Sequence, residues 1–266
     1  MKQHIVCYLY TRFDSIQKIN DFIKHYKKYK PGLKHKLIIC FKLLNFKEIE
    51  IAKRSLKSIK FEAFIDPCKV NDWDFGSYKR VAKKYYDKDI LFLNSHSYPI
   101  CNNWVKKLFF YKNKKTVIAT NASYESILDS IKLKGQIHKI IRYIIRKYKF
   151  SKDFKNFPNP HMSTSSFLVN SKYFYNYIRN KSLKNKYDTL KIESGKNSLT
   201  NYFKKKKIDI FLVNSDGNKF TESNWKLSET YMYKNQKKNI ISDKYSRSYN
   251  AANKQKKNIA MKNTWG

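Results

Sequence analysis

The chain has 266 residues, of which 41% are hydrophobic and 16% aromatic, which excludes a wholly disordered chain and allows one large domain with or without an appendage. Lys and Arg number 57 against 20 Asp and Glu, so the formal net charge is +37. This charge favours anionic partners such as phosphates, nucleic acid or an acidic membrane surface. The abundance of Lys, Asn, Ile, Tyr and Phe is equally what an AT-rich coding bias produces, so part of the charge has a reading without function.

The cysteines and the apolar runs bear on the compartment. Cys7, Cys40, Cys68 and Cys101 include no CxxC pair, which argues against a disulfide framework or a zinc site and for a reducing compartment. The first residues lack an apolar stretch followed by a small-residue cleavage site, so no secretory signal is expected. No apolar run approaches the roughly 20 residues of a membrane span. We therefore expect a cytoplasmic protein.

Short apolar runs alternate with amphipathic segments over the first 120 residues. Strands are expected at 4–10, 36–44, 61–65, 89–93 and 116–120, and helices at 16–29, 46–59, 78–86 and 104–111. This alternation predicts βαβ units, hence an α/β fold with a mostly parallel, Rossmann-like sheet flanked by helices. Ligands bind beyond the carboxyl ends of such strands, so the loops after the third and fourth strands are candidates.

The second half is less regular and forms a helical or irregular C-terminal part. Expected elements are a basic amphipathic helix at 135–150, a strand at 166–170, a helix at 194–207, a strand at 208–213 and a polar tail from 235. The helix carries the apolar stripe Ile137, Ile140, Ile141, Ile144, Ile145 and Tyr148, surrounded by Lys139, Arg142, Arg146 and Lys147. It packs against the domain or lies on an anionic membrane surface, and the sequence leaves both open.

The segment 71–78, NDWDFGSY, follows the third strand and opens the third helix. Its two acids, Asp72 and Asp74, with Gly76 and Ser77 in a short loop, suit recognition of a ribose or a base. The alternative is that Asp74 or Ser77 simply caps the helix.

A second polar segment, Asn94-Ser95-His96, follows the fourth apolar strand directly. Asn94 and His96 are two apart at a strand end, so both can face one site. His is a competent ligand for borderline metals, whereas Asn is weak and neutral. An ordinary turn is the alternative.

Glu193 and several isolated residues complete the candidates. Glu193 precedes the expected helix at 194–207, where the helix dipole stabilises a carboxylate; alternatively it is a general base for an acceptor hydroxyl. His161, Asp243 and Arg247 are candidates for acceptor or phosphate contacts.

A family resemblance rests on several segments that keep their order over most of the chain. They are DFGSYKRVAKKYYDKDILFLNSHSYPICNNWVKKL at 74–108, TNASYES at 120–126, FPNPHMSTSSFLVNSKYF at 157–174, ESGKNSLTNYF at 193–203 and NQKKNIISDKYSRSY at 235–249. Together they resemble bacterial and viral glycosyltransferase-like proteins related to rhamnan-synthesis proteins and, more distantly, to the large inverting family with the GT-A fold. The resemblance implies a GT-A-like domain at 1–234, with a donor half at about 1–125 and an acceptor half at about 126–234, and a basic extension at 235–266.

The resemblance also assigns roles to residues. In the broad family an Asp-x-Asp motif at the fourth strand binds a divalent metal that bridges the donor diphosphate. Asn94-Ser95-His96 occupies that place without either carboxylate, so Mn²⁺ or Mg²⁺ on His96 and Asn94, or Lys and Arg in place of the metal, would neutralise the diphosphate. Asp72 or Asp74 is implied for the nucleotide and Glu193 for the catalytic base.

The expected function is transfer of a sugar from a nucleotide-diphosphate sugar to a glycan or lipid-linked glycan of a capsule, lipopolysaccharide or related surface polymer. The expected place is the inner membrane face, with the protein bound peripherally to an anionic membrane surface. Two rival functions stand beside it. One is a catalytically inactive glycosyltransferase-like binding domain, for which the missing carboxylates argue. The other is nucleic-acid binding, for which the charge and the 21 Tyr and 18 Phe argue, although no nucleic-acid motif is present.

Overall fold

The computed structural model of the chain describes residues 4–132 and 140–266. The strands are β1 (His4–Thr11), β2 (Lys36–Lys42), β3 (Glu62–Asp66), β4 (Asp89–Leu93), β5 (Tyr98–Pro99), β6 (Thr116–Ala119), β7 (Ala122–Ser123), β8 (His161–Met162), β9 (Ser166–Asn170), β10 (Asp209–Val213), β11 (Lys219–Phe220) and β12 (Ile241–Ser242). The helices are α1 (Ile16–Lys28), α2 (Phe46–Leu56), α3 (Trp73–Lys84), α4 (Trp104–Phe110), α5 (Ile140–Asp153), α6 (Ser171–Ile178), α7 (Lys186–Ser194), α8 (Leu199–Lys205), α9 (Lys244–Ala251), α10 (Lys254–Trp265) and the 3₁₀ helix η2 (Glu222–Ser228).

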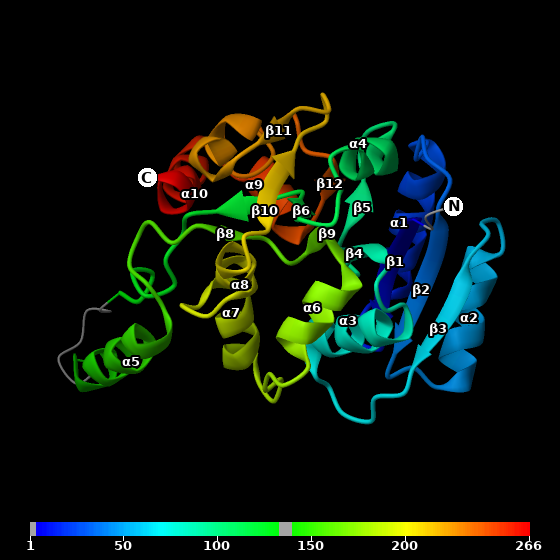
Figure 1. Cartoon of the computed structure of the whole chain (residues 1–266), viewed down its shortest axis with the longest axis horizontal. Helices are drawn as coiled ribbons and strands as arrows, with labels where there is room; N and C mark the ends of the chain where they lie inside the picture. The colour runs from blue at the N-terminus through cyan, green and yellow to red at the C-terminus, as the bar shows by residue number, and fades with distance from the viewer. Residues whose placement is uncertain (1–3, 133–139) are drawn as a thin grey trace.

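One eight-stranded sheet organises the molecule in the order β11-β10-β6-β9-β4-β1-β2-β3. β9 runs antiparallel to both its neighbours and β11 antiparallel to β10, while β3, β2, β1 and β4 are parallel, as are β6 and β10. Helices lie on both sides of this sheet (Figure 1). The expected α/β class with a mostly parallel sheet flanked by helices is confirmed.

Each face of the sheet has its own core because successive side chains of a strand point to opposite faces. In β1, Ile5, Cys7 and Leu9 pack with residues of α3, α6 and α8, whereas Val6 and Tyr8 pack with residues of α1, α2 and α4. Burial on both faces explains why β1 and β4 read as continuous apolar runs rather than as alternating ones.

Two expected helix boundaries were wrong. The helix expected at 78–86 begins at Trp73 instead, so the segment 71–78 forms its first turns rather than a loop, and Asp72, not Asp74 or Ser77, is the N-cap residue. The helix expected at 194–207 is the shorter α8, which starts at Leu199 because Ser198 caps it by accepting from the amide of Asn201, and a separate helix, α7, ends at Ser194. Glu193 therefore lies in the last turn of α7, where the helix dipole does not stabilise a carboxylate.

The residues after 234 fold onto the domain. β12 pairs with β5, and Trp265 at the end of α10 is buried in the core on the α3 face. The indole Nε1 of Trp265 donates to the carbonyl oxygen of Tyr231 over 3.0 Å. Of the amphipathic helix expected at 135–150, residues 135–139 lie outside the described residues, and the rest is α5, which projects from the body (Figure 1). Within the described ranges, no helix has the length and apolarity to cross a bilayer.

Candidate functional site

The sheet's connectivity reverses between β1 and β4, because β2 and β3 extend on one side of β1 while β4 lies on the other. The crevice outside the carboxyl ends at such a point is where open α/β sheets bind ligands. Asp14 joins the two ends: its Oδ1 accepts from Ser95 Oγ over 2.7 Å, and its Oδ2 accepts from the amide and hydroxyl of Thr11 at 3.0 and 2.6 Å. Asp14 therefore links the carboxyl ends of β1 and β4.

Asn94, Ser95 and His96 form a tight turn at this edge. The Asn94 Oδ1 accepts from the amide of His96 at 3.2 Å and from Ser97 Oγ at 2.8 Å, so this oxygen is directed back into its own turn. The Nδ1 of His96 is buried without a hydrogen-bond partner among the residues that the structure describes.

A divalent metal fits poorly on these donors. Mg²⁺ and Mn²⁺ prefer carboxylate oxygens, Asn94 Oδ1 is occupied, and within 4–132 and 140–266 no three His, Cys, Asp or Glu side chains gather as ligands. The residues present at Asn94 and His96 therefore do not make the metal site that the resemblance implies.

Arg247 contacts His96 instead. Arg247 Nη1 donates to the His96 carbonyl oxygen at 3.0 Å and to Ser242 Oγ at 3.2 Å, and its guanidinium lies 4.7 Å from the centre of the Tyr98 ring. Burial lowers the pKa of His96, and the nearby charges of Lys18, Lys244 and Arg247 lower it further, while Asp14 opposes them. Across the described part of the chain, none of Lys18, Lys244 and Arg247 is in an ion pair with a carboxylate. This corner therefore carries several positive charges, which the carboxylate of Asp14 partly offsets.

Asp74 lies in the first turn of α3. Burial raises its pKa from 3.8 to about 6; Lys42 and a hydrogen bond from Asn94 lower it, while Asp14 and Glu193 raise it. The hydrogen bond from Asn94, which follows β4, places Asp74 at the same edge of the sheet.

Glu193, at the end of α7, is linked to this sheet edge through Thr164, because the carbonyl oxygen of the adjacent Ser165 accepts from the Asn94 amide at 2.9 Å. Its Oε1 accepts from the amide of Thr164 at 3.1 Å and from the Thr164 hydroxyl at 2.9 Å. Within the described residues the second oxygen, Oε2, accepts no hydrogen bond, so it is free to accept a proton from a ligand. The charge of Glu193 also raises the pKa of Tyr245, an exposed residue at the start of α9, after the larger effect of burial.

Asp243 is a buried residue that bonds to three different segments of the chain. It is 1% exposed, and its Oδ2 accepts from Ser165 Oγ at 2.8 Å and from Asn121 Nδ2 at 3.3 Å. Its Oδ1 caps α9 by accepting from the Ser246 amide at 2.7 Å. With every oxygen occupied, Asp243 positions Arg247 one turn further along α9 rather than meeting a ligand.

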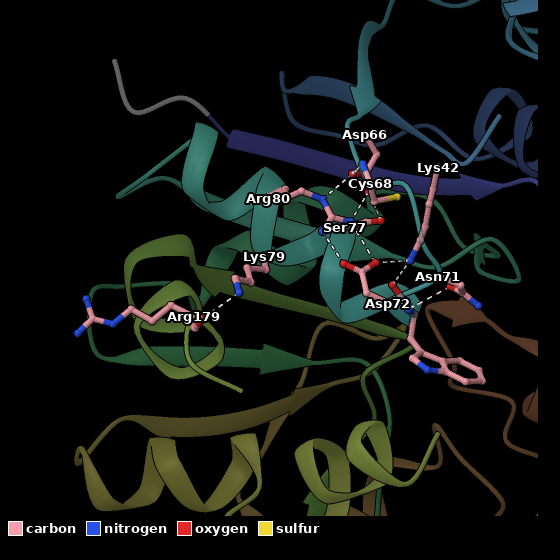
Figure 2. A network of polar contacts seen from close by, with 10 residues as sticks. Lys42, Asp66, Cys68, Asn71, Asp72, Ser77, Lys79, Arg80 and Arg179 are labelled. Carbon is pink, nitrogen blue, oxygen red and sulfur yellow. Dashed lines mark hydrogen bonds and ion pairs between the residues drawn. The ribbon is translucent and has the colours of Figure 1, made fainter. Parts of the chain in front are cut away.

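Asp72 and Ser77 belong to a separate polar network at the ends of β2 and β3 (Figure 2), and Gly76 lies against the Asp72 carboxylate. Asp72 pairs with Arg80 and, over 2.7 Å, with Lys42, which is 1% exposed. Burial raises the pKa of Asp72, but the hydrogen bonds from Arg80 and Lys42 outweigh it, so the net shift is downward. Ser77 donates to Asp66, which also pairs with Arg80.

Gly76 is required by that network. A Cβ built at position 76 would lie 1.9–2.2 Å from the carboxylate atoms of Asp72. The absence of a side chain is what lets Asp72 lie against the first turn of α3. Asp72, Gly76 and Ser77 are thus engaged in shaping the wall that carries Asp74.

His161 stands apart from these residues. It pairs with Ser123 between β7 and β8, and its Nδ1 lies 2.8 Å from the carbonyl oxygen of Asn159. In the described ranges no hydrogen bond connects it to His96, Asp74 or Glu193.

Comparisons with known proteins concern the fold. No protein-family model matches the chain, and no curated protein does. Among solved structures, the galactosyltransferase LgtC in complex with donor and acceptor sugar analogs is 10% identical, with 79% of this chain and 73% of that one covered and a TM-score of 0.43. A 4-diphosphocytidyl-2C-methyl-D-erythritol synthase is 6% identical, with 83% and 93% covered and a TM-score of 0.48. The bifunctional glycosyltransferase WbbM is 10% identical, with 78% of this chain covered and a TM-score of 0.40. This chain spans only 37% of WbbM and 36% of the glycosyltransferase GlyE of Streptococcus pneumoniae.

Sequence reasoning missed the residues that connect the site. Asp14 was not among the candidate residues, yet it links β1 to β4, while Ser15 is the N-cap residue of α1. Lys18 and Lys244 were not singled out among the 57 Lys and Arg. The available signal for Asp14 was its place directly after the first strand of a parallel sheet, where ligand contacts concentrate.

Proposed function

We propose that this chain transfers a sugar from a nucleotide-diphosphate sugar to a hydroxyl of a glycan or lipid-linked glycan, of the kind assembled into capsules, lipopolysaccharides or related surface polymers. One observation carries the proposal. At the sheet edge where β4 ends, Arg247 donates to the carbonyl oxygen of His96, and Glu193 is held by Thr164, next to the Ser165 whose carbonyl oxygen accepts from the Asn94 amide at 2.9 Å.

The cations suit the donor. Arg247, Lys18 and Lys244 supply positive charge where a donor diphosphate would lie, and Arg matches phosphate oxygens through two parallel hydrogen bonds. As the bond from the sugar to the diphosphate breaks, negative charge grows on the departing oxygen, and fixed cations stabilise it. In this proposal they take the place of a metal ion held by two aspartates.

Glu193 suits the acceptor. Thr164 holds Oε1, which leaves Oε2 available to the hydroxyl group of an acceptor. The proton of that hydroxyl passes to Glu193, and the acceptor oxygen bonds to the anomeric carbon of the sugar. The bond from the anomeric carbon to the diphosphate oxygen breaks, and the nucleoside diphosphate leaves with its electron pair. Asp74 would contact the nucleoside or sugar from the α3 wall.

A thermal-shift screen of nucleoside diphosphates and nucleotide sugars, with and without Mg²⁺ and Mn²⁺, tests the proposal. A ligand that binds only the folded state stabilises it by mass action. We expect a shift with one nucleotide class that is lost in Asp74→Ala, followed by release of nucleoside diphosphate when an acceptor is added. Binding without release or transfer would indicate the inactive binding domain. Absence of any shift, together with salt-dependent binding of DNA or RNA, would overturn the proposal.

A further inference from the structure

The helix α5 presents an apolar face that nothing in the described structure covers. None of its residues is buried, and Ile141, Ile144, Ile145 and Tyr148 are 68%, 57%, 61% and 63% exposed. Together with Ile140 they recur at the i, i+1, i+4, i+5, i+8 spacing that defines one helical face. Soluble surfaces rarely expose such a contiguous stripe without a partner.

The opposite side of α5 is the one that holds it to the protein. Tyr143 and Phe150 pack against a small cluster of Leu128, Ile131 and Phe154. Asp153 accepts from the Tyr187 hydroxyl over 2.8 Å, and its backbone oxygen accepts from the amide of Lys196 over 2.7 Å. Because α5 is attached through this side, its isoleucine face remains uncovered. The helix itself projects from the body (Figure 1).

The charges on α5 select the partner. The other side chains of α5 are rich in positive charge, and no acidic residue occurs in the helix before Asp153, which is engaged by Tyr187. Arg146 lies over Phe150 on the attached side, and the other basic residues are Arg142, Lys147, Lys149 and Lys152. An apolar stripe bordered by Lys and Arg is the pattern of helices that lie in the interface of an anionic bilayer. An apolar protein groove would match the isoleucines but not the basic border.

A basic cavity lies at the foot of the same helix. It has a volume of about 230 Å³ and is lined by four lysines, Lys152, Lys181, Lys191 and Lys196, with Asp153 and Asp188 among its other residues. Lys152 belongs both to α5 and to this cavity, so the charge of the helix continues into a recess that suits an anionic lipid headgroup.

We infer that α5 binds the surface of an anionic membrane, with its isoleucine face in the acyl boundary and its basic residues at the headgroups. The Lys196 amide and ammonium hold the end of α5 by donating to the backbone oxygens of Asp153 and Ser151, each over 2.7 Å. This attachment lies three residues after Glu193, so membrane docking would bring the Glu193 side of the crevice to the surface that carries a lipid-linked acceptor. Docking itself needs no sugar transfer and is testable separately.

Cosedimentation with vesicles tests the inference, using phosphatidylcholine alone and an equal mixture with phosphatidylglycerol. We expect binding to the mixed vesicles, and a loss of about tenfold or more in Ile141→Glu/Ile145→Glu. The matched control is Ile51→Glu/Val70→Glu, which makes the same charge change at residues 52% and 74% exposed elsewhere and should bind as the wild type does. Because Ile141 and Ile145 are exposed, the variant should also keep the wild-type melting temperature.

Two double charge-reversal variants distinguish docking by α5 from general electrostatic attraction of the whole protein. Arg142→Glu/Lys147→Glu should weaken binding by about fivefold for each basic residue lost, whereas the matched pair Arg54→Glu/Lys57→Glu, two exposed residues at the end of α2 and just after it, should have a much smaller effect. If both pairs weaken binding equally and the isoleucine variant binds normally, the net charge alone attracts the protein and the inference is wrong. Equal binding to vesicles without phosphatidylglycerol would also overturn it.

Discussion

The Ser95 hydroxyl donates to Asp14 Oδ1 over 2.7 Å. The two residues are 81 positions apart in sequence, and their bond joins the ends of β4 and β1. Because the other oxygen of Asp14 accepts from Thr11, the carboxylate binds both sides of the point at which the sheet reverses. The shape of the crevice therefore depends on Asp14 before any ligand enters.

Asp14→Ala should destabilise the fold by about 1–3 kcal/mol, because it leaves the Thr11 amide and the Ser95 hydroxyl without their acceptor. Urea unfolding followed by circular dichroism measures this. Asp216→Ala is the control: Asp216 is 48% exposed and pairs with Lys238 at the surface, so about 0–1 kcal/mol is expected. Equal losses in both variants would show that Asp14 has no linking role.

Glu193→Gln should lower the rate of transfer by about 10²–10⁴-fold and leave the dissociation constant of the donor unchanged, because Gln keeps the bonds from Thr164 but cannot take a proton. Single-turnover assays and donor titrations measure the two quantities. Glu222→Gln, at a surface ion pair with Lys204, should behave as the wild type. Loss of donor binding together with the rate would assign Glu193 to binding instead.

Arg247→Ala should weaken nucleoside diphosphate binding by about tenfold or more, since hydrogen bonds to charged groups contribute about 1.5–3 kcal/mol. Isothermal titration calorimetry against the nucleotide found in the screen measures the effect. Arg54→Ala, on the exposed side of α2, controls for the loss of one positive charge. Unchanged affinity in Arg247→Ala would move the diphosphate away from this corner.

The raised pKa of Asp74 makes its contribution to stability depend on pH. The folded carboxyl has a pKa of about 6 against 3.8 for the free group, so the folded state holds the proton more tightly. The resulting stabilisation is complete below about pH 4 and is lost as the pH rises through 6. A shift of about two units corresponds to at most about 3 kcal/mol.

Asp74→Asn should therefore be more stable than the wild type at pH 8, by up to about 3 kcal/mol, and equally stable near pH 4. Urea unfolding at a series of pH values measures the difference. The exposed Asp216→Asn should show no such trend. A difference that is the same at pH 4 and pH 8 would contradict the pKa assignment.

Gly76→Ala should destabilise the fold by several kcal/mol, about 3–5, because the new Cβ would displace an Asp72 carboxylate that Lys42 and Arg80 hold in place. In an Asp72→Ala background the clash is absent, so the same change should cost only a small fraction of that. Comparing the four proteins in a double-mutant cycle measures the coupling. Additive effects would show that Asp72 does not contact position 76.

The sequence alone was sufficient for the strands that are buried on both faces. β1 and β4 are apolar over their whole length, and β4 was placed at 89–93 as observed. The start of α3 could not be read in the same way, because a glycine four residues after Asp72 argues against a helix unless the contact between Gly76 and Asp72 is known. That contact depends on Lys42 and Arg80, which are far from one another in sequence.

The candidate site was predictable by position and not by partners. The strand ends pointed to Asn94, His96 and Asp74, since local pattern determines where strands stop. Which candidate carboxylates already accept hydrogen bonds depends on contacts between distant parts of the sequence, such as those from Lys42 to Asp72 and from Ser165 to Asp243. Such pairings leave no periodic trace in one sequence.

The antiparallel insertion of β9 between β4 and β6 has a consequence for synthesis of the chain. β4 and β6 never touch as neighbours; each pairs with β9, which is made some 50 to 75 residues later. A nascent chain that ends near residue 125 therefore has β1 to β7 but leaves the edges of β4 and β6 that will face β9 unpaired. We expect folding on the ribosome to wait for residue 170, and the crevice to form in a single late step rather than half by half.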